Sequence, residues 1–332
     1  MIAGVYEPFA GTIAVTLAII GGLRLGPPTG YMGGKRSLTG AILGAAGVVP
    51  GEGAERIVVS DVGPWGDFWT VIAAGDGHAV ANVLRSWRSE DPRRLWDRLA
   101  DLPPMEDPVE RAAQFVWLQA RSASCTPIWW EGGTLVAQSG ARDGAGVPAS
   151  QCGGRWLMPT GSRNGTRRGG LYAATQKEAI QRDNGREKRA CGGVLNVRTV
   201  ANRIDAIADA FARRRGAPIE VVHDDVGVGF ARLPQDLTGW VAFVDPPYEK
   251  ATRYAGLCSR ARAVGIAATA ADRGARTLVS ESVALPELTC EGWPTMDITH
   301  ARIGARSPKP EWLTMNREPA HRVATQQRMF GG

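Results

Sequence analysis

The sequence lacks the residue patterns that build a metal centre or a disulfide framework. Its five cysteines, at positions 125, 152, 191, 258 and 290, are scattered and odd in number, and no Cys-x-x-Cys pair or Cys/His ligand spacing occurs. We therefore expect reduced thiols and no metal ion. Reduced thiols are typical of the cytoplasm, where disulfides are rare.

A membrane-spanning stretch is missing as well. The apolar run near the N-terminus, residues 13–20, is too short to cross a bilayer. Glu7 and Pro8 precede this run, in place of the basic segment that opens a signal peptide. We expect no membrane partner, and we expect a strand followed by a buried helix at this end of the chain.

The glycine-rich stretch "GYMGGKRSL" lacks two residues that an ATP-binding Walker A loop requires. That loop needs a glycine at position 29 and a serine or threonine at position 36, where this chain has Thr29 and Arg36. The stretch has other useful properties. Gly33 and Gly34 allow the backbone to approach a ligand closely, and Lys35 can reach a carboxylate or a phosphate.

What the chain does contain is an alternation of strand-like and helix-like patterns. Apolar runs predict strands, and apolar residues at helical spacing predict the helices between them. The expected strands are residues 2–6, 56–60, 219–225, 240–248 and 276–282 with a closing stretch at 310–316, and the expected helices are 12–21, 36–46, 78–121, 197–215 and 257–273. This alternation predicts an α/β fold with a doubly wound, mostly parallel, Rossmann-like sheet.

The composition changes after residue 121. Residues 122–196 are rich in Gly, Ser, Arg and Trp, with strand-like pieces such as "GGTLVAQ" and "GGRWLMP". Between residues 150 and 215 there are 14 Lys and Arg against 5 Asp and Glu, whereas the whole chain has a net charge of +6. We therefore divide the chain into 1–121, a basic insertion at 122–196, and 197–332. A solvated insertion and a surface for a polyanion are both open interpretations of this block.

The apolar run "WVAFV" ends abruptly in Asp245, Pro246, Pro247 and Tyr248. Folds with parallel strands bind ligands beyond the carboxyl ends of those strands. Two prolines remove two backbone N–H donors, so this turn presents mainly carbonyl acceptors beside a carboxylate. Such acceptors suit an exocyclic amino group, and the tyrosine ring can stack on a planar base. The four residues therefore predict a grip on an aromatic amine, with a Pro-terminated strand and a packed tyrosine as the structural alternative.

Two further strand ends carry features suited to a ligand. In "VYEPFAG" an apolar strand ends at Glu7 and turns into a helix, and the small Gly11 in the turn allows close ligand approach. A second strand ends at Asp61, and an acidic residue there often bonds ribose hydroxyls. Each feature alone also fits an ordinary turn or a helix cap.

Together these stretches resemble the Dam-like DNA adenine-N6 methyltransferases, which use S-adenosylmethionine. The resemblance includes the fainter matches "TLVSES", similar to the strand after the catalytic loop, and "KPEWLTMN", similar to the closing strand. The aromatic-x-Gly-Gly-Lys segment follows the Pro-Phe-x-Gly loop, as in phage-type members with a rearranged order, and Ile13 stands where a second glycine is common. The main motifs of the family are matched here by Tyr31–Lys35, Glu7–Gly11, Asp61 and Asp245–Tyr248.

The resemblance implies a Rossmann-like methyltransferase sheet that holds S-adenosylmethionine. Glu7 is implied to lie near the amino-acid end of the cofactor, Lys35 by its carboxylate and Asp61 at its ribose. Apart from the resemblance, Asp225 at another strand end is a candidate contact to the adenine ring, and an ordinary turn carboxylate is an equal alternative. The residues expected to contact the cofactor are Glu7, Pro8, Phe9, Ala10, Gly11, Tyr31, Gly33, Gly34, Lys35, Asp61, Asp225 and Asp245.

The resemblance also implies the way in which an adenine is held. Asp245 and the carbonyl of Pro246 would accept hydrogen bonds from the N6 amino group, and Tyr248 would stack on a base flipped out of the duplex. The expected catalytic residues are Asp245, Pro246, Pro247 and Tyr248.

DNA is the implied partner, in a bacterial or phage-infected cytoplasm. The basic block would contact phosphates, which makes binding sensitive to salt, and Trp129, Trp130 and Trp156 are candidates to wedge or stack. The expected DNA contacts are Arg155, Arg163, Arg167, Arg168, Lys188 and Arg189.

Other functions remain open at this point. An amino-methyltransferase acting on cytosine N4, on RNA or on a protein glutamine would share the tetrapeptide, although Asp245 at its first position favours adenine. A DNA-binding protein with a vestigial methylase fold is a further alternative. His223 lies at a strand end without an assigned role, and the other histidines, His78, His300 and His321, have no partner that the sequence identifies.

Overall fold

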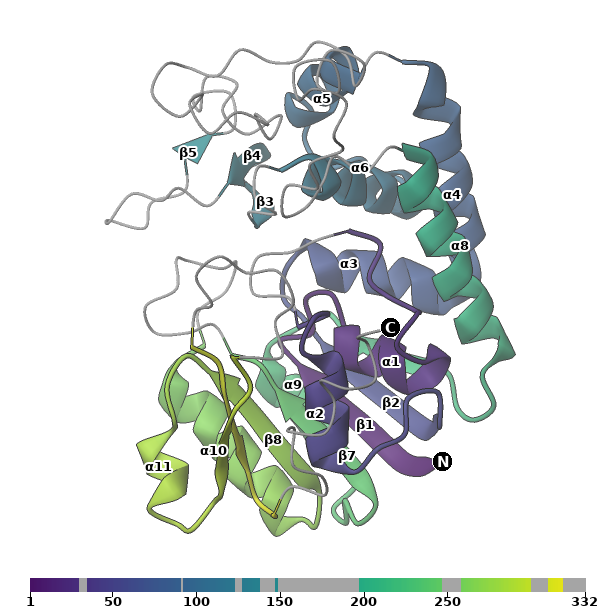
Figure 1. Cartoon of the computed structure of the whole chain (residues 1–332). Helices are drawn as coiled ribbons and strands as arrows, with labels where there is room; N and C mark the ends of the chain where they lie inside the picture. The colour runs from purple at the N-terminus through teal and green to yellow at the C-terminus, as the bar shows by residue number, and fades with distance from the viewer. Residues whose placement is uncertain are drawn as a thin grey trace, which may run out of the picture.

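The computed structural model describes residues 1–29, 35–90, 92–122, 127–137, 147–148, 197–246, 258–299 and 310–318. Its main feature is a seven-stranded sheet flanked by helices (Figure 1). A group of helices, α3, α4, α6 and α8, lies together at one side of the sheet, and a small three-stranded sheet lies beside α6. The fold is therefore mixed α/β, as expected.

The central sheet is mostly parallel. Its strands run in the order β6-β2-β1-β7-β8-β10-β9, and all neighbouring pairs are parallel except the two that involve β10. The first five follow the doubly wound order 3-2-1-4-5 when they are numbered along the chain, which is compatible with a Rossmann-like fold. The strands are β1 (Ile2–Pro8), β2 (Ala54–Ser60), β6 (Ile219–Val222), β7 (Trp240–Val244), β8 (Arg276–Glu281), β9 (Thr295–Asp297) and β10 (Trp312–Met315).

Apolar side chains cover both faces of this sheet. All five residues of β7 are buried, as a strand between two helical layers requires. Along β1 the faces alternate: Val5 packs with helices α1 (Ala14–Gly21) and α2 (Thr39–Ala46), whereas Tyr6 packs with α9 (Val226–Ala231) and α10 (Arg260–Asp272). This alternation places one pair of helices on each face of the sheet.

Strand β1 lies at a topological switch point, because the chain continues to strands on one side of β1 and later returns to strands on its other side. The next strand of the chain, β2, pairs with one side of β1, and β7 pairs with the other side. The connections on the two sides of β1 diverge here, and doubly wound sheets bind their ligands beyond the carboxyl ends of the strands at such a point. Both the Glu7–Gly11 turn and Asp245 follow these two strands.

An aromatic cluster joins the helical group to the sheet. It forms between α3 (Pro64–Val71), α6 (Pro108–Arg121) and α8 (Val197–Arg213), and Trp65, Phe68, Trp69 and Phe115 are its buried rings. Helices α4 (Gly77–Ser86) and α5 (Pro92–Ala100) complete the group. A π-helical turn with Gly75 at φ 100° links α3 to α4, a conformation that favours glycine.

The first helix of this group, α3, was absent from the sequence prediction. Its sequence "PWGDFWTV" reads as a turn because it combines proline, glycine and two tryptophans. The glycine is needed for packing, since a Cβ atom at Gly66 would lie 2.3 Å from the Asp61 carbonyl oxygen. The short elements α9, α11 (Pro286–Thr289) and β9 were also missed, because elements of a few residues carry too little periodicity to detect.

Several boundaries differ from the prediction. The helical stretch expected at 78–121 is divided into α4, α5 and α6, and the strand expected at 240–248 ends at Val244. Two other differences have identifiable reasons. The strand expected at 219–225 ends at Val222, since the side chain of Asp225 accepts a hydrogen bond from the Gly227 N–H and caps α9. The helix expected from residue 257 begins at Arg260, with Ser259 as its capping residue.

The expected insertion falls mostly outside the described residues. The pieces that are described include β3 (Ile128–Glu131), β4 (Thr134–Ala137) and β5 (Val147–Pro148), which form the small antiparallel sheet. The strand-like "GGTLVAQ" contains β4, whereas "GGRWLMP" is not described.

Several features bear on the class of protein. None of the helices in the described part of the chain is long and apolar enough to cross a bilayer. The described residues contain no group of three or more His, Cys, Asp or Glu that could hold a metal ion. Cys258 and Cys290 are free thiols, and the other three cysteines lie outside the described ranges.

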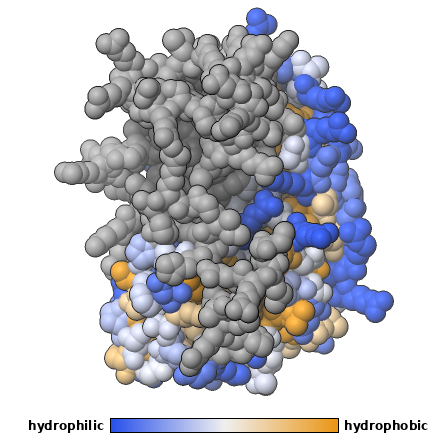
Figure 2. All heavy atoms as spheres, in the orientation of Figure 1, coloured by the Kyte–Doolittle hydropathy of each residue, from blue (hydrophilic) through white to orange (hydrophobic). Residues whose placement is uncertain are grey.

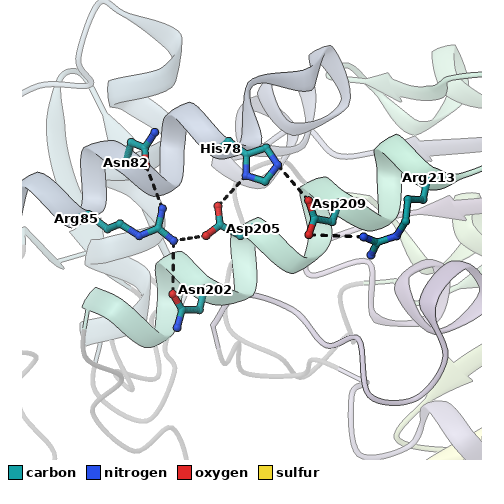
Figure 3. Close-up of polar contacts among 7 residues, drawn as sticks. All are labelled: His78, Asn82, Arg85, Asn202, Asp205, Asp209 and Arg213. Atoms are coloured by element: carbon teal, nitrogen blue, oxygen red, sulfur yellow. Dashed lines mark hydrogen bonds and ion pairs between the residues drawn. The ribbon is translucent and has the colours of Figure 1, made fainter.

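A polar network on the surface ties α4 to α8 (Figure 3). His78 Nδ1 lies 2.9 Å from Asp205 Oδ1, and His78 Nε2 lies 3.2 Å from Asp209 Oδ1. Arg85 also pairs with Asp205, and Arg213 lies 3.6 Å from Asp209. Figure 2 shows hydrophilic residues gathered along this side of the molecule. His78 therefore has partners that the sequence did not identify, whereas His300 and His321 lie outside the described residues.

The His78 contacts predict a pH-dependent contribution to stability. The hydrogen bond to Asp205, together with the charges of Asp205 and Asp209, raises the pKa of His78 above its usual 6.5. The stabilisation is complete below pH 6.5 and is lost as the pH rises through the higher pKa of the folded state. We expect His78→Gln to lower the melting temperature by about 1–2 °C at pH 5.5 and by less at pH 9, because exposed ion pairs contribute little. Asn82→Ala serves as the control, and an equal effect of His78→Gln at both pH values would contradict the prediction.

Candidate functional site

Residues from six segments meet at the carboxyl edge of the sheet: the ends of β1, β2, β7 and β8, the start of β10, and the segment that carries Lys35. Strand register sets their positions: Pro8 of β1 is level with Ser60 of β2, and Val244 of β7 is level with Val279 of β8. The residues that follow in β7 and β8 are Asp245 and Ser280, so these two side chains are adjacent. Because β10 is antiparallel, its amino end lies at this same edge and brings Glu311 to the site.

Lys35 occupies the centre of this group. Its ammonium nitrogen lies 2.8 Å from Asp245 Oδ1 and 3.3 Å from Glu311 Oε1. The lysine side chain is only 3% exposed, and a buried charge of this kind is tolerated when opposite charges surround it. The sequence predicted that Lys35 reaches a carboxylate, and in the structure it contacts two carboxylates of the chain itself.

Asp245 is held through one of its two oxygens. Ser280 Oγ donates a hydrogen bond of 2.8 Å to Asp245 Oδ1, the same oxygen that faces Lys35. Ser280 is fully buried, whereas the side chain of Asp245 is 21% exposed. Among the described residues, these contacts leave Oδ2 as the oxygen able to accept from a ligand. The neighbouring Pro246 is buried and lacks a backbone donor.

Glu7 is a second buried carboxylate at the switch point. Its Oε2 accepts hydrogen bonds from the backbone N–H and the hydroxyl of Thr16, at 2.9 and 2.6 Å. Burial raises the pKa of Glu7 to about 7, the nearby charge of Asp245 adds to this effect, and the Thr16 bonds oppose it. Glu7 therefore titrates near neutral pH while it also holds the start of α1.

Asp61 holds the turn that follows β1. Its Oδ2 accepts a hydrogen bond of 2.8 Å from the Gly11 N–H, and its Oδ1 accepts one of 2.8 Å from the Gly63 N–H. Loss of hydration raises the pKa of Asp61, and these backbone bonds work against that rise. Asp61, expected at the ribose from the sequence, thus links the turn after β1 to the turn after β2.

The turn itself has an unusual backbone. Phe9, Gly11 and Ile13 have φ values of 57°, 45° and 42°, in the left-handed region. Side chains other than glycine adopt this region at a cost, on the order of 1–3 kcal/mol for each residue. Position 13 is therefore one that glycine would occupy without strain. Such strain is retained only where neighbouring groups enforce it.

Trp69 of α3 is one of these enforcing groups. Its indole Nε1–H donates a hydrogen bond of 2.7 Å to the Gly11 carbonyl oxygen. The backbone of β2 contributes a further contact, since the Ala10 N–H donates to the Ser60 carbonyl at 2.9 Å. The turn is thus fastened to β2 and to α3.

Two residues that follow β6, His223 and Asp225, lie apart from the residues around Lys35. Asp225 caps α9 and pairs with Arg262, beyond the end of β6. His223 Nδ1 lies 3.2 Å from Asp67 Oδ1, and the bond to Asp67 raises the pKa of His223. Neither of them contacts Lys35 or Asp245, because β6 is separated from β7 by two strands. The role of Asp225 at an adenine ring stays a prediction.

Many of the residues selected from the sequence lie outside the described ranges. Of the tryptophans, Trp129 and Trp130 stand on β3, and Trp130 Nε1 donates to the Leu102 carbonyl at 3.4 Å. The undescribed residues are Tyr31, Gly33, Gly34, Pro247, Tyr248, Trp156 and the six basic residues Arg155, Arg163, Arg167, Arg168, Lys188 and Arg189.

Sequence reasoning missed four residues of the site: Thr16, Trp69, Ser280 and Glu311. Ser280 lies in "TLVSES" and Glu311 in "KPEWLTMN", so the resemblance had marked both stretches without selecting a side chain. No local signal marks Thr16 or Trp69, because their roles depend on contacts made only after folding.

The Glu7 carboxyl group predicts a measurable effect of pH on stability. Its pKa is raised in the folded protein, so its contribution is complete below its usual pKa and is lost as the pH rises through about 7. Glu7→Gln keeps an acceptor for Thr16 and removes the titration. Relative to the wild type, we expect this variant to gain up to about 3 kcal/mol of unfolding free energy between pH 4.5 and pH 8.

Urea unfolding at several pH values measures this difference. Glu55→Gln, at an exposed position on β2, is the matched control. Parallel pH curves for the wild type and Glu7→Gln would show that the buried carboxyl does not titrate in this range.

Comparison with known proteins adds no further evidence on identity. No protein-family model matches the sequence, and no curated protein matches it. The site itself is therefore the main indication of function: a buried Lys35 lies between Asp245 and Glu311, next to a strained turn at the switch point of the sheet.

Proposed function

We propose that this chain is an S-adenosylmethionine-dependent methyltransferase that transfers a methyl group to the N6 amino group of adenine in DNA, with the base flipped out of the duplex. One observation carries the proposal. Asp245, fixed through Oδ1, adjoins the Glu7–Gly11 turn at the switch point, where a doubly wound sheet binds its ligands. An acceptor for an amino group and a turn suited to a nucleoside cofactor thus lie next to each other at the carboxyl ends of β1 and β7.

The acceptor side is supported by the chemistry of the Asp245 carboxylate. An amino group offers two N–H donors, which suit Asp245 Oδ2 and the carbonyl oxygen of Pro246. Hydrogen bonds to both would direct the nitrogen lone pair toward a methyl group in line. Ser280 and Lys35 restrain the carboxylate, and such preorganised positioning supplies most of the rate in reactions of this kind.

Lys35 acts on the acceptor side in this proposal. The resemblance implies a place by the methionine carboxylate, but the ammonium faces Asp245 and Glu311 in the structure. We assign it the role of holding Asp245 in place and balancing the charges of Asp245 and Glu311.

The donor side is supported by the local balance of charge. Glu7, Asp61, Asp245 and Glu311 bring four carboxyl groups to this edge of the sheet, and Lys35 brings one ammonium. An excess of acidic groups favours a cationic ligand over a neutral one. S-adenosylmethionine carries a sulfonium charge that disappears on methyl transfer, so such a site would hold the methyl donor more tightly than its product.

DNA as the substrate is supported by charge and by the tetrapeptide. The net charge of +6 and the basic block from 150 to 215 fit a polyanion. Asp245 at the first position of the tetrapeptide favours adenine over cytosine. Transfer to cytosine N4, to RNA or to a protein glutamine would use the same acceptors, so product analysis decides among them.

The decisive experiment uses methyl-labelled S-adenosylmethionine with DNA, followed by digestion to nucleosides. We expect label in N6-methyladenine. We also expect Asp245→Ala and Asp245→Asn to lower the rate by at least about 100-fold, because the amino group loses its charged acceptor. DNA binding, measured by gel shift, should be retained in both variants.

Asp236→Ala, which changes an exposed carboxylate, is the control and should methylate at the wild-type rate. Label in N4-methylcytosine, or label only in RNA, would show that the acceptor is not adenine in DNA. Full activity of both Asp245 variants would place the reaction elsewhere.

Ser280 provides a narrower prediction within the same site. Ser280→Ala removes the hydrogen bond to Asp245 Oδ1, and a bond to a charged group is worth about 1.5–3 kcal/mol. We expect kcat to fall by about 10- to 100-fold while KM for S-adenosylmethionine changes little, because the acceptor loosens and the donor turn does not. Thr277→Val on the same strand alters a buried hydroxyl with no hydrogen-bond partner among the described residues and is the matched control. Equal effects of the two substitutions would contradict a specific role for Ser280.

A further inference from the structure

We propose that Trp69 is a positioning residue that holds the Glu7–Gly11 turn in the conformation that receives the methyl donor. This inference rests on the proposed function, since the ligand of the turn is the cofactor named there. Trp69 lies in α3, outside every stretch that resembles the methyltransferase family. Its role follows from the hydrogen bonds that the backbone of Gly11 makes.

The backbone of Gly11 is gripped from both sides. Its N–H donates to Asp61 Oδ2 at 2.8 Å, and its carbonyl oxygen accepts from Trp69 Nε1 at 2.7 Å. Both partners come after β2, one at its end and the other in the helix that follows. The two bonds fix the orientation of the residue at the centre of the turn.

Trp69 is itself held rigidly. The side chain is fully buried, with the Phe68 ring edge-on at 4.7 Å and the Trp65 ring stacked at 5.9 Å. Phe211 of α8 stacks on it at 6.4 Å. An indole packed among rings on several sides keeps its N–H pointing in one direction, which is what a positioning group requires.

The turn needs such an external support. Phe9 and Ile13 adopt left-handed backbone conformations that side chains avoid in the absence of restraint. If the Trp69 bond were lost, the Gly11 carbonyl would be left without its partner and the turn would gain access to relaxed conformations. A relaxed turn populates the binding-competent shape less often, so the apparent affinity for the cofactor falls in proportion.

Packing alone is the competing explanation for Trp69, and Trp117 provides the comparison. Trp117 of α6 is also buried, at 1% exposure, but its Nε1 has no hydrogen-bond partner among the described residues. Replacing either tryptophan with phenylalanine removes a similar volume from the helical group. Only at position 69 does the replacement remove a bond to the turn.

The experiment compares Trp69→Phe and Trp117→Phe in the full chain. Calorimetry gives the Kd for S-adenosylmethionine, steady-state assays give KM and kcat, and thermal melts give stability. We expect both variants to melt at lowered temperatures, with Trp69→Phe lower than Trp117→Phe because it also leaves the Gly11 carbonyl without its donor. We expect Kd and KM for the cofactor to rise about 5- to 15-fold in Trp69→Phe only, with kcat changed less than about threefold.

Amide hydrogen exchange provides a readout that does not depend on the cofactor. Peptides covering residues 8–14 should exchange faster in Trp69→Phe and at the wild-type rate in Trp117→Phe. If Trp69→Phe does not fold, benzothienylalanine at position 69 replaces the indole N–H with sulfur in nearly the same shape and supports the same comparison.

The outcomes separate the two proposals. Unchanged exchange in the turn and unchanged cofactor affinity in a folded Trp69→Phe variant would overturn the role of Trp69. Faster exchange in that variant, combined with no binding of S-adenosylmethionine by the wild type, would overturn the proposed function and leave the turn-holding role of Trp69 in place. Equal losses of affinity in both variants would show that packing, and not the hydrogen bond, supports the turn.

Discussion

The candidate site depends on the ion pairs of one buried lysine. Lys35 lies between Asp245 and Glu311, which come from segments more than 200 residues further along the chain. The buried Glu311 and the partly exposed Asp245 would repel each other in the absence of a compensating charge, and each would lose hydration without a partner. The ammonium therefore fixes the relative positions of the start of α2, the end of β7 and the start of β10.

The turn after β1 is organised in a different way, through backbone hydrogen bonds. Asp61 and Trp69 hold the N–H and the carbonyl of Gly11, and the strained residues on either side depend on that support. The acceptor group and the turn meet at the switch point because β1 and β7 are neighbours in the sheet. Charge thus fixes the position of Asp245 through Lys35. Helix α3 fixes the turn after β1 through the Trp69 hydrogen bond to Gly11.

Much of the central sheet could be predicted from local patterns. Fully apolar runs such as "WVAFV" are recognisable because strands covered on both faces need no alternation. Helices α3 and α9 could not be predicted, since their short sequences, "PWGDFWTV" with a proline and a glycine and "VGVGFA" with two glycines, show no clear helical period. His78 illustrates the same limit for side chains: its partners Asp205 and Asp209 stand on α8, more than 120 residues away.

The sequence by itself determined the identities of the acidic residues at the strand ends and their order along the chain. Glu7, Asp61 and Asp245 could each be placed after an apolar run, because the end of a buried strand is a local property. Only the tertiary structure decided that Lys35 faces Asp245 and that Trp69 bonds to Gly11. Those contacts join segments whose distance in the sequence carries no information about distance in space, and strand order and register bring them together.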